Sequence, residues 1–357
     1  MTTQVKDHAK LVLWLTVLLI FMTAIHGTAL AQYLQFNLVS TSSPFTPNND
    51  PNLVNGWGLA FFPTSPFWVA DNFTGVSTLY DHSGTPLNLV VTIPLSSHPL
   101  APVSLPTGIV TNSTSGFVVS EGANSGPALF LFDTEDGTIS GWNPSVDLTH
   151  SIIAVDNSAS GALYTGLAIA RNSSGTFLYA ADAVNNKVDM YDSKFHLVKS
   201  FSDPATPAGL SVYGIQQIGG RLYVTLGSPV PFQGGAIDVF NTNGKLLRRL
   251  TTNGPGGPLE APWGTALAPG DFGPLSNDLL IGNVDDGHIN AFDPKTGNFL
   301  GTMTHPNGKK ITIGGLWALQ FGAGNPANGD KNQLFFTAGP ANYNKGLFGM
   351  ITAKGTD

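Results

Sequence analysis

Short apolar runs of four to six residues recur along most of the chain, and turn segments rich in Gly, Asn and Asp separate them. Such runs are too short for ordinary helices and are typical of buried or half-buried strands. Three local patterns return in the same order, with successive copies 48 to 58 residues apart. A period of this length indicates a protein built from one repeated supersecondary unit.

The first pattern is an aromatic or small residue, then Gly or Ala, then a hydrophobic strand. Its six copies are Gly56–Leu59, Pro106–Ile109, Tyr164–Leu167, Val212–Ile215, Pro262–Thr265 and Leu316–Leu319. The second pattern is an apolar run ending near a polar residue, at Phe67–Asp71, Phe117–Glu121, Phe177–Asp182, Arg221–Thr225, Asp278–Asn283 and Gln333–Thr337. The third is an aromatic residue with Asp or Asn before a turn, at Tyr80–Gly84, Phe132–Gly137, Tyr191–Asp192, Phe240–Gly244 and Phe292–Gly297.

Each unit therefore predicts a small antiparallel sheet of about four strands. The Asp or Asn of the third pattern can bond its own backbone two residues on, and the Gly supplies the positive φ of a tight hairpin. A unit of about 50 residues with four strands is typical of one propeller blade. A single blade exposes two apolar faces, which neighbouring blades bury in a ring. The fold class that we predict is all-β, a six-bladed β-propeller; a β-sandwich also has evenly spaced strands, but not three patterns in register.

The two ends of the repeated region predict how the ring closes. The last unit stops after its third strand, near Leu347–Ile351. A strand-like run at Tyr33–Val39 has no blade of its own. We expect this run to supply the missing outer strand of the last blade, which would leave no long exposed sheet edge.

The N-terminus resembles a targeting segment. Lys6 and Lys10 precede an apolar run from Leu11 to Ile25, and the small-x-small sequence Ala29–Ala31 follows. This order is typical of a secretory signal peptide, whereas a membrane anchor, the alternative interpretation, needs about 20 apolar residues. We predict a signal peptide at residues 1–31 and one propeller domain at residues 32–357, secreted or periplasmic.

Composition excludes several classes of function. The formal charge is −7, from 16 Lys+Arg against 23 Asp+Glu, which disfavours nucleic acid because its binding needs clustered basic side chains. There is no Cys, so disulfides, thiol catalysis and Cys-ligated metals are excluded. We expect a monomer without a membrane span once the signal peptide is removed.

The repeats resemble a known family. Val69–Asn72 with Tyr80–Asp81, and Tyr179–Asp182 with Val188–Asp192, look like NHL-type repeats. From Gln35 to Ile351 the chain resembles a family of secreted bacterial six-bladed propellers, some of which end in a PEP-type sorting anchor that this chain lacks. The resemblance implies the fold and export, but no established activity.

An enzyme of the gluconolactonase type is the main catalytic alternative. Those similar propellers hold one divalent cation in the channel, with an Asp in a Pro-Asp-Gly start to an inner strand. The corresponding starts here carry Thr107, Thr165 or Trp263 instead of Asp. That change removes an oxygen ligand that Ca²⁺ or Mg²⁺ would need, so the sequence favours a non-catalytic binding module over a metal-dependent hydrolase or lactonase.

Polar residues follow the second strands and form the first candidate site. In a propeller these loops share one face with the loops that enter the inner strands, so their oxygens can converge on the channel mouth. The candidate metal ligands, for Ca²⁺ in particular, are Asp71, Glu121, Asp182, Asn283 and Asp285. The alternative is that each residue only caps a tight turn.

Aromatic residues at the start of the inner strands form the second candidate site, and they are Trp57, Tyr213, Trp263 and Trp317. Their rings can stack on a sugar ring or another flat ligand at the channel, or they can fill the space between blades. The partner that we expect is an unknown protein, glycan or small molecule. No cofactor is firmly indicated, and the eight His show no spacing typical of a metal site.

Overall fold

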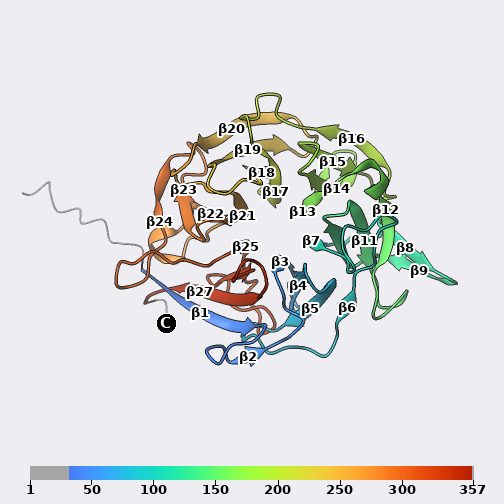
Figure 1. Ribbon diagram of the computed structural model, residues 1–357, viewed down its shortest axis with the longest axis horizontal. Coiled ribbons are helices and arrows are strands. Elements are labelled where there is room, and N and C mark those ends of the chain that lie inside the picture. Colours follow the sequence, from blue (N-terminus) through green and yellow to red (C-terminus); the bar gives the residue numbers. More distant parts are fainter. Residues whose placement is uncertain (1–31, 356–357) are drawn as a thin grey trace, which may run out of the picture.

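Six antiparallel sheets surround a common axis in the computed structural model, which describes residues 32–355 (Figure 1). Each sheet has its first strand nearest the axis and its fourth at the rim. The structure thus confirms the predicted all-β, six-bladed β-propeller. The predicted signal peptide, residues 1–31, lies outside the described residues. Within residues 32–355 no helix is long and apolar enough to cross a membrane.

Blades 1, 3, 4 and 5 are four-stranded sheets in simple chain order. Blade 1 contains β3 (Gly56–Ala60), β4 (Phe67–Asp71), β5 (Val76–Tyr80) and β6 (Val91–Thr92). Blade 3 contains β13 (Tyr164–Asn172), β14 (Gly175–Asp182), β15 (Lys187–Tyr191) and β16 (Leu197–Phe201). Blade 4 contains β17 (Ser211–Ile218), β18 (Arg221–Gly227), β19 (Gly235–Asn241) and β20 (Leu246–Asn253). Blade 5 contains β21 (Pro262–Leu267), β22 (Leu279–Asn283), β23 (Ile289–Phe292) and β24 (Phe299–Thr302).

Blade 2 differs from the predicted order because it carries an inserted hairpin. Its sheet consists of β7 (Pro106–Thr111), β10 (Phe130–Thr134), β11 (Thr138–Trp142) and β12 (Ile152–Asp156). Between β7 and β10, a separate hairpin of β8 (Val118–Glu121) and β9 (Asn124–Pro127) projects from the rim (Figure 1). The predicted second strand at Phe117–Glu121 is therefore wrong, and β10 takes that place. The number of blades is unaffected.

Blade 6 is completed by the N-terminal strand, as predicted. It contains β25 (Leu316–Phe321), β26 (Leu334–Ala338) and β27 (Leu347–Ala353), and β1 (Tyr33–Ser40) pairs antiparallel with β27. The short β2 (Asn48–Asn49) adds to the outer edge of β1. The Tyr33 hydroxyl also donates to the Phe272 carbonyl at 2.8 Å, beside the 3₁₀ turn Gly273–Leu275 that follows β21. The first strand thus fastens blade 6 and reaches blade 5, while the other 3₁₀ turn, Ser158–Ser160, precedes blade 3.

Close contact between inner strands explains the Gly of the first pattern. A Cβ atom on Gly58 would lie 2.4 Å from the Thr107 carbonyl oxygen of the next blade, and one on Gly264 would lie 2.3 Å from the Trp317 carbonyl oxygen. These distances are far below van der Waals contact, so a side chain would push the blades apart. The sixth copy has Ala318, which is buried. The glycines therefore set how closely the inner strands surround the axis.

Candidate functional site

One face of the ring collects both sets of candidate residues. The first residue of an inner strand pairs with the last residue of the second strand, as in Gly56 with Asp71 and Tyr164 with Asp182. The loops that enter the inner strands and the loops that follow the second strands therefore lie on the same face, which we call the mouth face. The opposite face is the one on which the inner strands end.

The four predicted aromatic residues meet at the axis on the mouth face. Trp57 and Trp317 stack with ring centroids 3.5 Å apart, and Trp263 approaches both edge-on, at 6.3 Å and 6.0 Å. Tyr213 packs edge-on against Trp317 at 5.9 Å, and Tyr343 lies 5.8 Å from the same ring. Because blades 4 and 6 are not neighbours, these contacts cross the axis. We call these five residues the aromatic cluster.

Burial divides the aromatic cluster into a base and a rim. Trp57 and Trp317 are only 5% and 2% exposed, so their faces are used in stacking on each other and on their neighbours. Trp263, Tyr213 and Tyr343 are half-buried, and the Trp263 indole Nε1 donates to the Thr165 carbonyl oxygen at 2.7 Å. The accessible part is therefore the rim, from blades 4, 5 and 6, over a base that closes the channel.

Hydrogen bonds fix the orientation of the base. The Trp317 indole Nε1 donates to Asn55 Oδ1 at 2.8 Å, and Asn55 Nδ2 donates to Asn72 Oδ1 at 3.0 Å. Asn72 Nδ2 donates in turn to Glu135 Oε1 at 2.8 Å. The Trp57 indole Nε1, by contrast, is buried without a hydrogen-bond partner among the described residues. A chain of amides thus connects the stacked indoles to a carboxylate in the loop of blade 2.

Two carboxylates in the mouth-face loops, those of Asp285 and Glu135, contribute to the electrostatic environment of the Tyr213 hydroxyl group. Burial is the largest cause that raises the pKa of Tyr213 well above its usual range. Electrostatic interactions with Tyr343, Asp285 and Glu135 raise it further. Burial also raises the pKa values of Asp285 and Glu135. Neither carboxylate forms an ion pair with a Lys, Arg or His in the described part of the chain. The rim of the aromatic cluster is therefore acidic as well as aromatic.

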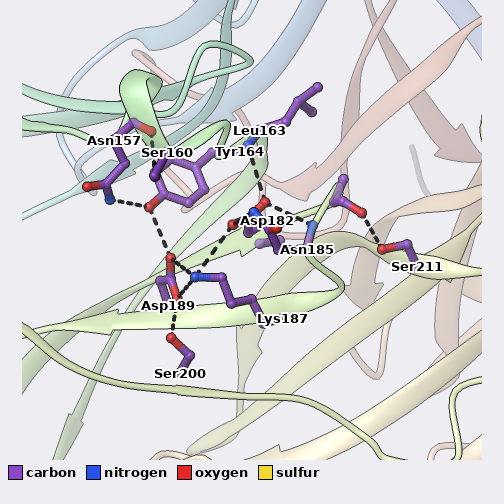
Figure 2. A network of polar contacts seen from close by, with 12 residues as sticks. Asn157, Ser160, Leu163, Tyr164, Asp182, Asn185, Lys187, Asp189, Ser200 and Ser211 are labelled. Carbon is purple, nitrogen blue, oxygen red and sulfur yellow. Dashed lines mark hydrogen bonds and ion pairs between the residues drawn. The ribbon is translucent and has the colours of Figure 1, made fainter.

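Asp182, a predicted metal ligand, is held in an ion network inside blade 3 (Figure 2). Its carboxylate accepts hydrogen bonds from the Leu163 and Asn185 backbone N–H groups, and Lys187 Nζ lies 3.6 Å away. Lys187 Nζ also lies 2.9 Å from Asp189, which accepts hydrogen bonds from Tyr164 and Ser200. An ammonium group in this position competes with any metal cation for the same oxygens.

Asp71 and Asn283 occupy the corresponding positions in blades 1 and 5, and both are completely buried. Asp71 Oδ2 accepts a hydrogen bond from Thr78 at 2.7 Å, whereas Asp71 Oδ1 has no partner among the described residues. Burial raises the pKa of Asp71 well above its usual range. Asn283 donates to the Pro258 carbonyl, and its Oδ1 is likewise unpartnered. Asp285, next in blade 5, instead accepts the Phe232 backbone N–H at 2.7 Å.

Glu121 does not join the other candidates at the mouth face. It is exposed on β8 of the inserted hairpin, which projects from the rim of the ring (Figure 1). The sequence placed it at the mouth because Phe117–Glu121 was assigned as the second strand of blade 2. Within residues 32–355 no group of three or more His, Asp or Glu side chains is arranged to hold a metal ion. The Ca²⁺ site remains a prediction.

Sequence reasoning missed Glu135 and Tyr343, which lie at the mouth. Glu135 belongs to the turn between β10 and β11, and the wrong strand assignment in blade 2 moved that turn to the other face. Tyr343 lies in the long loop between β26 and β27, beside Asn342 and Asn344. The signal that identifies both is their position in a loop after a second strand, once the hairpin is recognised as an insertion.

Two relatives at the level of sequence come from Acanthamoeba polyphaga mimivirus. Uncharacterized protein R648 of Acanthamoeba polyphaga mimivirus is 34% identical over 332 residues, which is 88% of this chain and 78% of that protein. Uncharacterized protein L690 of the same virus is 32% identical over 332 residues, which is 88% of this chain and 84% of that protein. No protein-family model matches the chain.

Solved structures share the fold at low identity. Virginiamycin B lyase from Staphylococcus aureus has a TM-score of 0.51 at 14% identity, over 90% of this chain and 99% of that one. The PQQ-bound aldose sugar dehydrogenase from Streptomyces coelicolor has a TM-score of 0.54 at 13% identity, over 91% and 99%. The gluconolactonase XC5397 from Xanthomonas campestris has a TM-score of 0.51 at 14% identity, over 85% and 87%. These likenesses show the propeller fold alone, whereas the sequence relatives show that the chain belongs to the family of the mimivirus proteins R648 and L690.

Proposed function

We propose that the protein is a secreted, non-catalytic binding module that holds a glycan or a small hydroxylated molecule at its mouth face. The observation that carries this proposal is the aromatic cluster at the mouth, in which Tyr213, Trp263 and Tyr343 are only partly buried. The carboxylates of Glu135 and Asp285 lie in mouth-face loops of blades 2 and 5, and both contribute to the raised pKa of Tyr213. Aromatic rings offer flat apolar contact, and carboxylates accept hydrogen bonds from hydroxyl groups. Both are typical of sites for sugars and other polyhydroxylated ligands.

The buried base supports binding more than catalysis. Trp57 and Trp317 close the channel under the rim, so a ligand would rest on a rigid floor and not enter the axis. The charged neighbours of Asp182 also support a structural role for that carboxylate. Export is proposed from the N-terminal segment: cleavage after Ala31 would leave Tyr33, the first residue of β1, in the mature chain.

A glycan array probed with the fluorescently labelled mature protein tests the proposed function. We expect binding that is lost in Glu135→Gln and Asp285→Asn, because each change removes a charged acceptor with little change in shape. Glu121→Gln is the matched control, since it makes the same carboxylate-to-amide change at an exposed residue of the hairpin that projects from the rim. A turnover screen on lactones and sugar esters, with and without a chelator, runs beside the array. Chelator-sensitive turnover would overturn the non-catalytic proposal in favour of a metal-dependent hydrolase.

A further inference from the structure

The axis contains a second region, separate from the mouth, on the other side of the aromatic cluster. Below the indoles, a narrow chamber of about 20 Å³ is lined by residues from all six inner strands, including Trp263 and Thr265. It continues into a pocket of about 140 Å³ towards the face on which the inner strands end. The two share Leu59, Ile109, Gln216 and Gln320 in their linings, so together they make up one region along the axis. We call it the lower cavity.

The polar groups of the lower cavity have unused hydrogen-bonding capacity. Gln216, Gln217 and Gln320 line the wider part, and their carboxamides make no side-chain hydrogen bond among the described residues. In the narrow part, Thr265 is 4% exposed and its Oγ1 is buried without a partner. A buried hydroxyl group without a partner costs about 1–3 kcal/mol. The cavity therefore holds donors and acceptors that a bound molecule can satisfy.

Charge and size restrict the kind of molecule. No charged side chain lines either part of the cavity, so an ion would lose its hydration without a compensating partner. The remaining walls are apolar, with Leu59, Phe61 and Ile169 among them. A volume of about 140 Å³ compares with the roughly 150 Å³ cavity that accepts benzene, a molecule of six non-hydrogen atoms.

We propose that the lower cavity is a binding site for a small uncharged polyol of about the size of glycerol, independent of the ligand at the mouth. Hydroxyl groups both donate and accept, as carboxamides do, so each can pair with the side chains of Gln216, Gln217 and Gln320. A first hydroxyl group reaching towards Thr265 would satisfy its Oγ1. The carbon backbone of such a ligand contacts the apolar walls.

Side-chain amide NMR of the protein labelled with ¹⁵N-glutamine tests the proposal. Glycerol is titrated to molar concentration, and serinol, in which the central hydroxyl of glycerol is an ammonium group, is the charged probe of matched shape. We expect saturable shifts of the Gln216, Gln217 and Gln320 amide signals with glycerol and none with serinol. The Gln35 amide, on β1 at the outer edge of blade 6 and far from both sites in the fold, is the internal control for solvent effects of glycerol.

Variants decide whether the shifts report the lower cavity. Gln320→Leu is expected to weaken glycerol binding at least about fivefold, the change that follows from loss of one hydrogen bond, while Gln35→Leu on the outer strand β1 leaves it unchanged. Thr265→Val, which keeps the shape, tests the narrow part in the same way. Equal shifts with serinol, shifts that persist unchanged in Gln320→Leu, or no saturation with glycerol would each overturn the proposal. None of these results depends on whether a glycan binds at the mouth.

Discussion

Blades 1 and 3 place a carboxyl group at the same point of the same hairpin and treat it in opposite ways. Asp71 and Asp182 each end a second strand, and the residues that pair with them on the third strand are Val76 and Lys187. Two residues further on, Thr78 in blade 1 corresponds to Asp189 in blade 3. Blade 3 thus has Lys187 between the carboxylates of Asp182 and Asp189. In blade 1 the corresponding residues, Val76 and Thr78, are both uncharged.

The difference shows that a repeated Asp need not have a repeated role. In blade 3 the Lys187 ammonium lies 3.6 Å from Asp182 and 2.9 Å from Asp189, so one cation compensates two nearly fully buried carboxylates. In blade 1 no cation forms an ion pair with Asp71 within residues 32–355, and burial raises its pKa well above the usual range. Asp71 is therefore a buried carboxyl group with no cation beside it, whereas Asp182 belongs to an ion network with Lys187.

The largest loss in the free energy of unfolding is expected when the ion network of blade 3 loses its cation, Lys187. Lys187→Met leaves Asp182 and Asp189 buried without compensation, and removing one partner of a buried ion pair costs 3–5 kcal/mol when both are fully buried. Because Lys187 is about one third exposed, we expect a loss of about 2–3 kcal/mol in the free energy of unfolding. Urea unfolding at neutral pH measures it.

The control is Lys354→Met, which removes an exposed Lys and is expected to change stability by less than about 0.5 kcal/mol. A Lys187→Met variant as stable as this control would show that solvent, and not Lys187, compensates the two carboxylates. The contrast between the blades would then disappear.

The second prediction is that the same change, Asp to Asn, alters the free energy of unfolding in opposite directions at positions 182 and 71. Asp182→Asn removes one partner of Lys187, and we expect a loss of about 1–2 kcal/mol at neutral pH. Asp71→Asn should instead stabilise the protein at neutral pH. The folded pKa of Asp71 is raised, so the folded state binds a proton that the unfolded state releases, and stability is lost as pH rises above the unfolded pKa.

Unfolding measured across acidic to neutral pH checks both parts of this prediction. Below the unfolded pKa of Asp, Asp71→Asn is expected to match the wild type, because the carboxyl group is then protonated in both states. The gain in the free energy of unfolding of Asp71→Asn over the wild type should grow as pH rises above the unfolded pKa of Asp. A loss of stability in Asp71→Asn at neutral pH would mean that Asp71 is ionised and has a partner of its own.

Sequence patterns predict those features that depend on backbone pairing, and they do so here for the ring. The apolar run at Tyr33–Val39 has no blade of its own, so its pairing with β27 followed from counting strands. Strand pairing places the loops of Glu135 and Tyr343 on the mouth face once the hairpin is recognised as an insertion, but it does not show which side chains of those loops reach the axis. Lys187 shows the same limit, since nothing in its spacing distinguishes a solvated Lys from one held between two buried carboxylates.

The smallest expected loss of stability concerns the hydroxyl groups that donate to Asp71 in blade 1 and to Asp189 in blade 3. Thr78→Val removes the donor to Asp71 without changing shape, and Ser200→Ala removes a donor to Asp189. We expect a loss of about 1 kcal/mol for Thr78→Val, because the buried carboxyl group of Asp71 then loses its side-chain donor and keeps only the backbone N–H of residue 78. Ser200→Ala should cost about 0.5 kcal/mol, since Asp189 keeps Lys187 and Tyr164. Paired urea denaturation curves measure the difference, and a larger loss for Ser200→Ala would show that the network of blade 3 depends on its hydroxyl donors as much as on its cation.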